Sequence, residues 1–259
     1  MTAMRLKRYP SAGGGISLGK MGVGATMLKQ GKTARDYVQN GLVAMWDGIE
    51  NAGWGVHDAN ATTWKDLVGG VGDCTIYGTP NWSDDALACL KRCFARSTSL
   101  DFSNTILSGT YTVEILIRPE PTGVSNGGFI STGDNGSRVF WIWERNANYA
   151  ELIDSFATAQ GTWNRPSTGR TIAHLLQFSV APTGAFFAVD GVVFQTKTTT
   201  STSALTAGWL DIGRIRVTTE TSGYIGNDSI CRCSLYSRAL TADEIAANYA
   251  IDKERFNLP

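Results

Sequence analysis

The chain has no long hydrophobic run and few cysteines or histidines, the residues that membrane proteins, disulfide-stabilised scaffolds and catalytic triads respectively need. It has 259 residues, and no stretch approaches the roughly eighteen consecutive apolar residues of a membrane-spanning helix. Five cysteines are too few for a disulfide-stabilised scaffold, and two histidines, His57 and His174, offer little for a catalytic triad. The 42% hydrophobic content is ordinary. We therefore expect a globular protein without a membrane partner.

Acidic residues are absent from the first 35 residues, although the whole chain has 23 basic and 23 acidic residues. Glycine is frequent there, and large apolar residues are few, so this segment cannot form its own core. We predict a basic arm over 1–35 and one domain over 36–259. The predicted partner-binding residues are Arg5, Lys7, Arg8, Lys20, Lys29, Lys32 and Arg35. They are expected to bind an acidic surface of a partner protein or of a second copy.

Two alternatives for the arm remain open. A solvated tail without a partner has the same composition. Nucleic-acid binding is less favoured, because the basic residues are sparse and Tyr9 is the only aromatic residue among them. The basic start is not followed by an apolar segment, so we expect no signal peptide and synthesis in the cytoplasm.

Short apolar segments separated by turn residues fill the chain from residue 36 onward. Residues 111–118 alternate well between apolar and polar, which predicts a strand with one buried face. Asp190-Gly191 lies between two apolar runs within 186–195 and predicts a two-residue hairpin turn. Further strands are predicted over 41–46, 139–144, 149–153, 170–180, 209–214 and 230–236. Many short strands of this kind indicate an all-β antiparallel sandwich.

One short helix is predicted near the C-terminus. Thr241-Ala-Asp-Glu244 is a capping box, and helical spacing continues to about Asp252. In the strand before this helix, Cys231 and Cys233 are two apart, which predicts that both lie on one face as small buried residues.

The closing segment, Ser234-Leu-Tyr-Ser-Arg-Ala-Leu-Thr-Ala-Asp-Glu-Ile-Ala-Ala-Asn-Tyr249, resembles the last strand and helix of laminin-G-like, concanavalin-A-like jelly-roll domains. Other segments agree with that family in order: 41–47, 64–69, 111–119, 187–193 and 211–214. The resemblance implies a jelly roll of two antiparallel sheets and commonly a glycan-binding role. Similar domains occur in gut bacteria and in the virions of their tailed phages.

The aromatic residues give the leading binding hypothesis. Trp141 and Trp143 are two apart on a predicted strand, so both project from one sheet face, and Tyr149 follows across a turn. Sugars stack on flat aromatic rings and hydrogen-bond to neighbouring polar groups. The predicted glycan-binding residues are Trp141, Trp143, Arg145, Asn146, Tyr149 and Trp163. The alternative is that Trp141 and Trp143 are core residues, with Phe140 and Ile142 on the outer face.

Catalysis and metal binding have weaker support. A retaining glycoside hydrolase needs two carboxylates on one face, and no strand has acidic residues at that spacing, so we predict no catalytic residue. We predict no cofactor, although the resemblance makes calcium a possibility. Asp47, Asn227 and Asp228 are the candidate calcium ligands, but Cys231-Arg232 stands where relatives often have an acidic pair.

A basic arm before a domain of this kind resembles a tailed-phage virion component, and the resemblance implies a non-catalytic, homo-oligomeric protein of the capsid-decorating or fibre-like type. In this hypothesis the arm binds a capsid or other virion protein, and the sandwich faces outward and binds glycans. A bacterial lectin-like module is the first alternative, and a glycoside hydrolase is the second.

Overall fold

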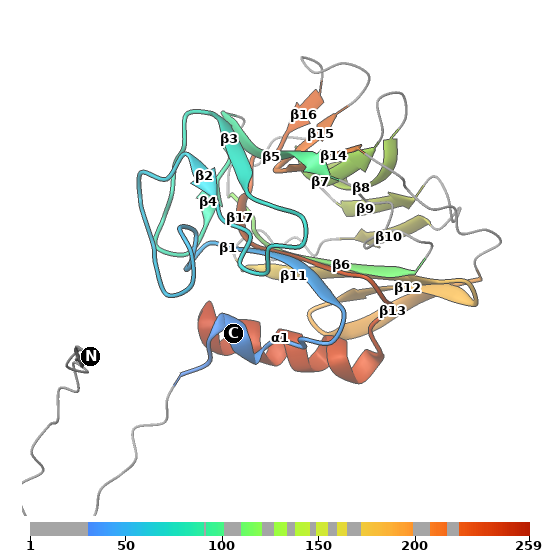
Figure 1. Cartoon of the computed structure of the whole chain (residues 1–259). Coiled ribbons are helices and arrows are strands. Elements are labelled where there is room, and N and C mark those ends of the chain that lie inside the picture. The colour runs from blue at the N-terminus through green and yellow to red at the C-terminus, as the bar shows by residue number, and fades with distance from the viewer. Residues whose placement is uncertain are drawn as a thin grey trace, which may run out of the picture. The chain divides into compact units, whose positions relative to one another are not determined.

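The structure is a computed structural model of the whole chain, drawn in Figure 1. It describes residues 31–259 apart from 91, 101–109, 121–126, 134–137, 146–148, 155–159, 165–171, 199–207 and 217–222. Only the backbone is described for the strand residues 98–100, 133, 138–141, 143–145, 149–154, 160–164, 216 and 223–224. The chain divides into two units, Met1–Gln30 and Gly31–Pro259, and the second contains every described residue.

The described residues form two stacked antiparallel sheets and one α-helix, which confirms the predicted sandwich (Figure 1). The seven-stranded sheet has the order β1-β17-β6-β11-β12-β13, with β4 paired to β17. Its strands are β1 (Leu42–Asp47), β4 (Leu87–Ala88), β6 (Tyr111–Arg118), β11 (His174–Ala181), β12 (Gly184–Val189), β13 (Val192–Lys197) and β17 (Ser229–Tyr236).

The ten-stranded sheet has the order β10-β9-β8-β7-β14-β5-β3-β2, and β15 and β16 are joined to it through β7. Its strands are β2 (Thr63–Trp64), β3 (Cys74–Gly78), β5 (Cys93–Leu100), β7 (Gly127–Gly133), β8 (Arg138–Arg145), β9 (Tyr149–Asp154), β10 (Gln160–Asn164), β14 (Gly208–Ile212), β15 (Arg214–Arg216) and β16 (Gly223–Ile225). A 3-10 helix η1 (Ala34–Asp36) precedes β1, and α1 (Ala242–Arg255) follows β17.

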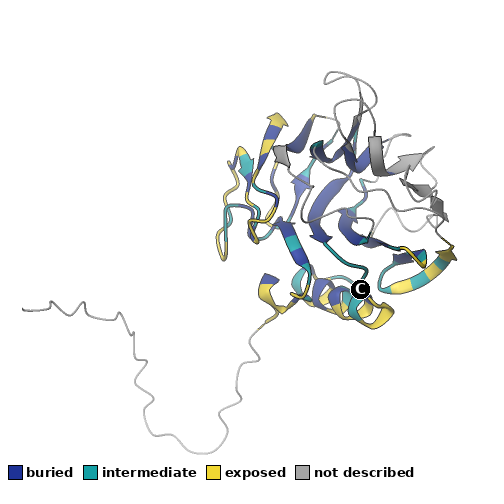
Figure 2. Ribbon diagram, turned by 45° about the vertical axis from the view of Figure 1, so that its right-hand side comes forward, coloured by how far each residue is buried: buried dark blue, intermediate teal, exposed yellow. Residues whose placement is uncertain are grey.

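The main core lies between the two sheets. Ile115 and Ile117 of β6 face Ala95 of β5, Leu210 of β14 and Ile142 of β8 within one cluster of buried side chains. Figure 2 shows that buried residues occupy the described strands of both sheets, whereas exposed residues lie on α1, on β13, and on β3 and the loops beside it. Buried apolar area of this extent is the main stabilising contribution to the sandwich.

Strand β6 differs from its prediction because both of its faces are buried. The outer residues Thr112 and Glu114 have no exposed area, since α1 lies across the outer face of the seven-stranded sheet (Figure 1). Alternation of apolar and polar residues therefore indicated the strand correctly, but not the covering of its polar face.

A buried polar network joins α1 to that face. Arg232 of β17 donates two hydrogen bonds to Asp252 of α1, at 2.9 and 2.7 Å, and one to Glu114 at 3.0 Å. The amide of Asn248 donates to both Glu114 oxygens and to the Tyr236 hydroxyl. Burial raises the pKa of Asp252, although Arg232 opposes this effect. Charged side chains thus fix the helix on the sheet.

A second set of contacts fixes the last turn of α1 to the start of the domain. Arg255 donates hydrogen bonds to Asp47, Glu50 and the Tyr37 hydroxyl. Tyr37 in turn donates to Asp252 at 2.6 Å. Tyr37, which precedes β1, and the end of β1 are therefore both tied to the last turn of the helix.

The structure confirms the predicted capping box at Thr241 and the predicted hairpin turn at Asp190-Gly191. Thr241 accepts a hydrogen bond from Glu244 N–H, and the Glu244 carboxylate accepts one from Thr241 N–H, so the capping box is complete. The helix continues to Arg255, one turn beyond the predicted end. Asp190 and Gly191 have φ angles of 52° and 78°, the left-handed conformations that this hairpin turn requires.

Two predictions about strands are wrong for reasons that side-chain alternation does not reveal. Gly213, with a φ of 83°, divides the strand predicted over 209–214 into β14 and β15. A β-bulge between Ile230 and Arg232 changes the alternation in β17. Cys231 consequently packs beneath α1 while Cys233 enters the main core, so the two cysteines do not share a face.

Candidate functional site

The outer face of the ten-stranded sheet carries a row of polar residues at consecutive register positions. Arg96 of β5 is paired with Asp211 of β14, and Asp211 is paired with Ser131 of β7. The alternating neighbours Ala95, Leu210 and Ile130 face the main core. Arg96, Asp211 and Ser131 therefore point away from the core, on the face opposite the seven-stranded sheet.

Arg96 and Asp211 form a buried ion pair in this row. The guanidinium donates from Nε and Nη2 to the two carboxylate oxygens, at 2.7 and 3.0 Å. Their side chains are 5% and 0% exposed. Such a pair fixes both groups in one geometry, and loss of either partner would leave a buried charge.

Aromatic rings lie directly beside this ion pair. Tyr77 of β3 and Phe94 of β5 are stacked, with centroids 5.3 Å apart and planes inclined by 7°. The Arg96 guanidinium carbon lies 5.3 Å from the Tyr77 centroid, and that of Arg214 lies 4.5 Å from the Phe94 centroid. Tyr77 is 42% exposed, whereas Phe94 is buried. We call Tyr77, Phe94, Arg96, Asp211 and Arg214 the aromatic–arginine cluster.

The register places most of the predicted glycan-binding positions on the same face. Position 141 pairs with Ser131, and positions 143 and 145 follow it on the same side of β8. Position 149 pairs with position 145. Ile142, between the two tryptophans, is fully buried in the main core. Backbone alternation therefore assigns Trp141, Trp143, Arg145 and Tyr149 to the outer face.

Two of the predicted residues are not brought into this group. Trp163 pairs with Ala150, and Ala150 pairs with Glu144, so position 163 belongs to the face that contains Ile142. Asn146 lies outside the described residues.

The sequence analysis did not identify the aromatic–arginine cluster. One signal was present: β5 alternates small residues (Cys93, Ala95) with large ones (Phe94, Arg96), which is typical of a strand with two different faces. Its proximity to Asp211 depends on the pairing of β5 with β14, which no local pattern indicates.

Two of the three candidate calcium ligands, Asp47 and Asp228, are engaged in other contacts. Asp47 is ion-paired with Arg255, and its carboxylate also accepts hydrogen bonds from Ile49 and Glu50 N–H. Asp228 accepts from Glu120 N–H at 3.1 Å. Among the described residues, no group of three or more His, Cys, Asp or Glu side chains is placed to hold a metal ion.

The predicted partner-binding residues are divided by the boundary of the described chain. Arg5, Lys7, Arg8, Lys20 and Lys29 lie outside it. Lys32 and Arg35 lie within the second unit: Lys32 forms an ion pair with Asp36, and the Arg35 guanidinium carbon lies 4.1 Å from the Trp54 ring centroid. These two basic residues therefore contact their own domain.

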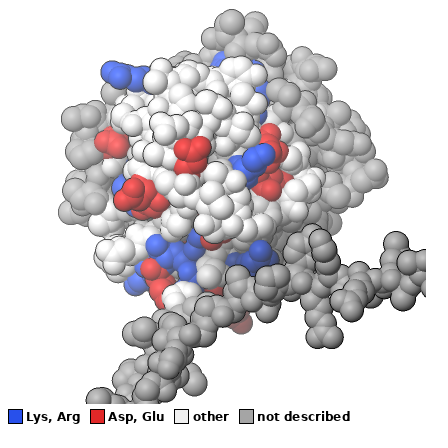
Figure 3. Space-filling view, turned by 60° about the vertical axis from the view of Figure 1, so that its left-hand side comes forward, with Lys and Arg blue, Asp and Glu red and all other residues white. Residues whose placement is uncertain are grey.

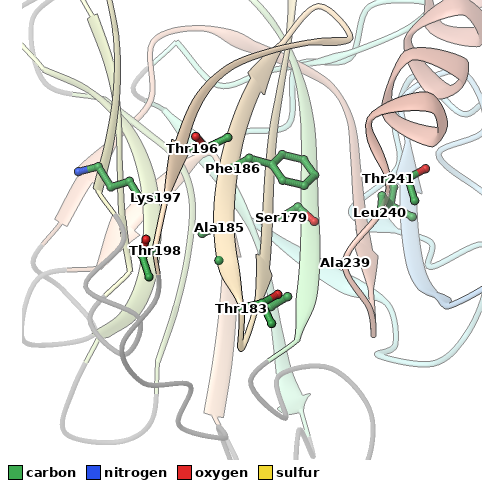
Figure 4. A pocket seen from close by; sticks show the side chains of 12 residues that line it. Ser179, Thr183, Ala185, Phe186, Thr196, Lys197, Thr198, Ala239, Leu240 and Thr241 are labelled. Carbon is green, nitrogen blue, oxygen red and sulfur yellow. The ribbon is translucent and has the colours of Figure 1, made fainter.

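A separate open groove of about 600 Å³ lies on the outer face of the seven-stranded sheet, before the first turn of α1 (Figure 4). A row formed by Ser179, Phe186 and Thr196 crosses it from β11 to β13. Its lining residues are Ser179, Ala181, Thr183, Gly184, Ala185, Phe186, Thr196, Lys197, Thr198, Ala239, Leu240 and Thr241. None of the predicted site residues lines this groove.

No protein-family model matches the chain, and no curated protein matches its sequence. Solved structures do match. Trypanosoma rangeli sialidase in complex with sialic acid aligns with a TM-score of 0.61 at 13% identity, over 83% of this chain and 33% of the sialidase. The chain thus spans about a third of that enzyme.

Two further structures share the fold. Domain 4 of AbnA, an extracellular arabinanase of Geobacillus stearothermophilus in complex with arabinotriose, aligns with a TM-score of 0.56 at 18% identity, over 80% of this chain and 98% of that domain. The binding domain of Botulinum neurotoxin DC in complex with SialylT aligns with a TM-score of 0.59 at 10% identity, over 83% of this chain and 52% of the toxin chain.

These likenesses show the β-sandwich fold, in agreement with the predicted fold class. Within the described part of the chain, no helix combines the length and apolar character that crossing a bilayer would require.

Proposed function

We propose that this protein is a non-catalytic glycan-binding protein and that the outer face of its ten-stranded sheet is the binding surface. The observation that carries the proposal is the aromatic–arginine cluster. It presents one exposed aromatic ring, that of Tyr77, beside a buried Arg96 that Asp211 holds in position. An exposed aromatic ring that is held rigidly from below is a surface on which the C–H face of a sugar can stack.

The backbone register supports a larger surface on the same sheet. Positions 141 and 143 lie across β7 from the cluster, on the same outer face. Two of the structural neighbours are described in complex with a carbohydrate or with SialylT, which agrees with a glycan as ligand.

A hydrolase has less support from the described carboxylates. Asp211 accepts hydrogen bonds from two guanidinium nitrogens of Arg96, Nε and Nη2. Glu114 lies beneath α1 and accepts hydrogen bonds from Arg232 and Asn248. A retaining hydrolase needs two carboxylates about 5–5.5 Å apart that can reach the substrate. Incubation of the protein with the glycans that it binds is expected to release no reducing sugar, and release would support the hydrolase instead.

The binding proposal is tested on a glycan array with the full-length protein and two variants. Tyr77→Ala is expected to weaken binding about tenfold, since a stacked aromatic ring contributes on the order of 1.4 kcal/mol. Phe194→Ala is the matched control, because Phe194 is 43% exposed but lies on β13 of the other sheet. Trp143→Ala is expected to resemble Tyr77→Ala.

Three results would contradict the binding proposal. The full-length protein binds no glycan selectively, or Tyr77→Ala binds as the unmodified protein does, or Phe194→Ala has the larger effect. Circular dichroism of each variant shows whether the fold is retained.

As the finer part of the proposal, we place the protein on a phage virion surface as an oligomeric capsid-decorating or fibre-like component, attached by its basic N-terminal residues. Support comes from the seven basic residues without an acidic one in 1–35 and from the resemblance of the closing segment. The side of the domain drawn in Figure 3 shows acidic and basic side chains interspersed among uncharged ones. That side does not favour a second copy as the acidic partner, so we favour a capsid protein.

Comparison of the full-length protein with residues 31–259 tests the attachment. Purified phage particles are expected to retain the full-length protein but not residues 31–259. Light scattering is expected to detect self-association of the full-length protein only, and both forms are expected to bind glycan equally. If both forms behave alike in every assay, the bacterial lectin-like alternative is supported.

A further inference from the structure

The groove on the outer face of the seven-stranded sheet lies where α1 leaves one end of the β12–β13 hairpin uncovered. At the covered end, Gly191 adjoins Ala246 and Tyr249 of the helix. At the other end, Ala185 pairs with Lys197, and both residues line the groove (Figure 4). The groove volume of about 600 Å³ lies within the range of small-molecule binding sites.

An aromatic ring forms part of the groove surface. Phe186 of β12 lies in register between Ser179 of β11 and Thr196 of β13. Phe186 is half-buried, so part of its side chain is open to the groove. A ring in this position offers a surface on which the C–H face of a sugar can stack.

Threonine hydroxyls from three parts of the chain surround this ring. Thr183 lies in the turn between β11 and β12, Thr196 and Thr198 lie at the end of β13, and Thr241 is the N-cap of α1. All four residues are exposed. Thr241 accepts a hydrogen bond from Glu244 N–H and keeps its own hydroxyl proton to donate. The rim of the groove therefore offers both donors and acceptors.

The charge of the lining narrows the class of ligand. Among the described residues that line the groove, Lys197 alone carries a charge, and no carboxylate accompanies it. A polyanion would find a single positive charge there. A lipid chain would cover the hydroxyls without bonding to them, which is unfavourable. A ligand with many hydroxyls and one apolar face, such as a sugar, complements both the rim and the ring.

We propose that this groove is a separate carbohydrate site, which binds the terminal part of a neutral glycan. The C–H face of a sugar stacks on Phe186, its hydroxyls bond to the threonines, and the Lys197 ammonium donates to one of its oxygens. The groove and Tyr77 belong to different sheets, so the proposal does not depend on glycan binding at the aromatic–arginine cluster.

Two such sites would make a single domain bivalent. The groove lies on the outer face of the seven-stranded sheet, and the aromatic–arginine cluster lies on the outer face of the ten-stranded sheet. Sites that face in opposite directions allow one molecule to join glycans on two surfaces, and the second attachment is then favoured by its high effective concentration.

A variant that fills the groove gives the primary test. Side chains directly opposite on neighbouring strands are in contact, so the indole of Thr196→Trp would lie over Phe186. Tryptophan suits a strand, and position 196 is exposed, so the fold is expected to be retained. Val192→Trp is the matched control, because Val192 is on the same strand and 67% exposed but does not line the groove.

The full-length protein and these variants are compared on an array of neutral glycans, and circular dichroism checks the fold of each. Thr196→Trp is expected to bind a set of these glycans at least about tenfold more weakly, while Val192→Trp binds them as the unmodified protein does. Replacing both Thr183 and Thr198 by valine keeps the side-chain shape but removes two hydroxyls. This double variant is expected to weaken the same glycans about tenfold, and unchanged binding would overturn the role of the hydroxyls.

Hydrogen exchange then locates the bound sugar. The array glycan that Thr196→Trp weakens most is added to the full-length protein, and exchange is measured by mass spectrometry. Exchange is expected to slow within 183–187 and 195–198. Slowing within 74–78 alone would show that the sugar binds at the other sheet, which overturns the groove as its site.

The Tyr77→Ala variant separates the groove from the aromatic–arginine cluster. If this variant loses every neutral glycan, the cluster is the sole site and the groove proposal is overturned. If it keeps the glycans that Thr196→Trp loses, the groove proposal is supported even where the cluster binds nothing. Equal binding of every neutral glycan by Thr196→Trp and the unmodified protein, including no binding by either, also overturns the groove proposal.

Discussion

Replacement of Arg232 by methionine is expected to destabilise the domain by about 3–5 kcal/mol, the cost of leaving buried charges without their partner. The Arg232 side chain has no exposed area, and neither have those of Glu114 and Asp252, its two carboxylate partners. Methionine fills much of the same volume but offers no positive charge and no donor. Both carboxylates would then have to be protonated or hydrated beneath α1, at the expense of helix docking.

Urea denaturation followed by tryptophan fluorescence measures this loss. With a denaturant dependence of about 3 kcal/mol/M, the midpoint is expected to fall by roughly 1–1.7 M. The matched control is Arg118→Met, since Arg118 also binds a carboxylate, Asp85, through two nitrogens. The side chains of that pair are 35% and 25% exposed, so its loss is expected to cost about 1 kcal/mol or less.

The reasoning is refuted if the Arg232 and Arg118 variants lose equal stability. A further check adds Glu114→Gln and Asp252→Asn to the Arg232 variant. These changes remove the orphaned charges and should recover part of the loss, whereas a purely steric defect would not be relieved.

Three further predictions concern the helix cap, the hairpin and the N-terminal residues. Arg238 lowers the pKa of Glu244 from 4.5 to about 2, so Glu244 stabilises the fold above pH 4.5 and this stabilisation is lost as the pH falls toward 2. Stability of the Glu244→Gln variant should therefore fall less in acid, and a pH dependence parallel to that of the unmodified protein would contradict the assignment. Gly191→Ala should lower stability by about 1–3 kcal/mol in thermal unfolding, because the position has a φ of 78° and the added Cβ would lie 3.0 Å from Tyr249 Cβ; an unchanged midpoint would show that the turn adapts. Deletion of residues 1–30 should leave the unfolding midpoint unchanged, and a large decrease would show that these residues stabilise the domain.

Local patterns in the sequence predicted most of the strands because alternation, hairpin turns and capping are properties of neighbouring residues. Asp190-Gly191 and the Thr241 capping box needed no tertiary information. The bulge before Arg232 did, since an extra residue changes the alternation only relative to the partner strand β6. The polar face of β6 was likewise ambiguous, because a buried Glu114 and an exposed one look alike until the helix that covers it is known.

The candidate site could be predicted only in the part that lies on consecutive strands. Trp141, Trp143 and Tyr149 share a face through one hairpin, so their spacing was informative. Tyr77, Arg96 and Asp211 come from three strands that are far apart in the sequence. Their meeting depends on the order β3-β5-β14 within the sheet, which single-sequence patterns do not specify.

The place of β17 in the seven-stranded sheet also constrains how the protein is made. This last strand lies between β1 and β6, and the helix that completes the outer face follows it. At 5–20 residues per second, a ribosome needs roughly 6–22 s to pass from the end of β6 to the start of this strand. During that interval β6 lacks the neighbouring strand β17, because β17 has not yet been synthesised. A chain released before residue 229 lacks the strand that joins β1 to β6, so the outer part of this sheet is completed only at the end of synthesis.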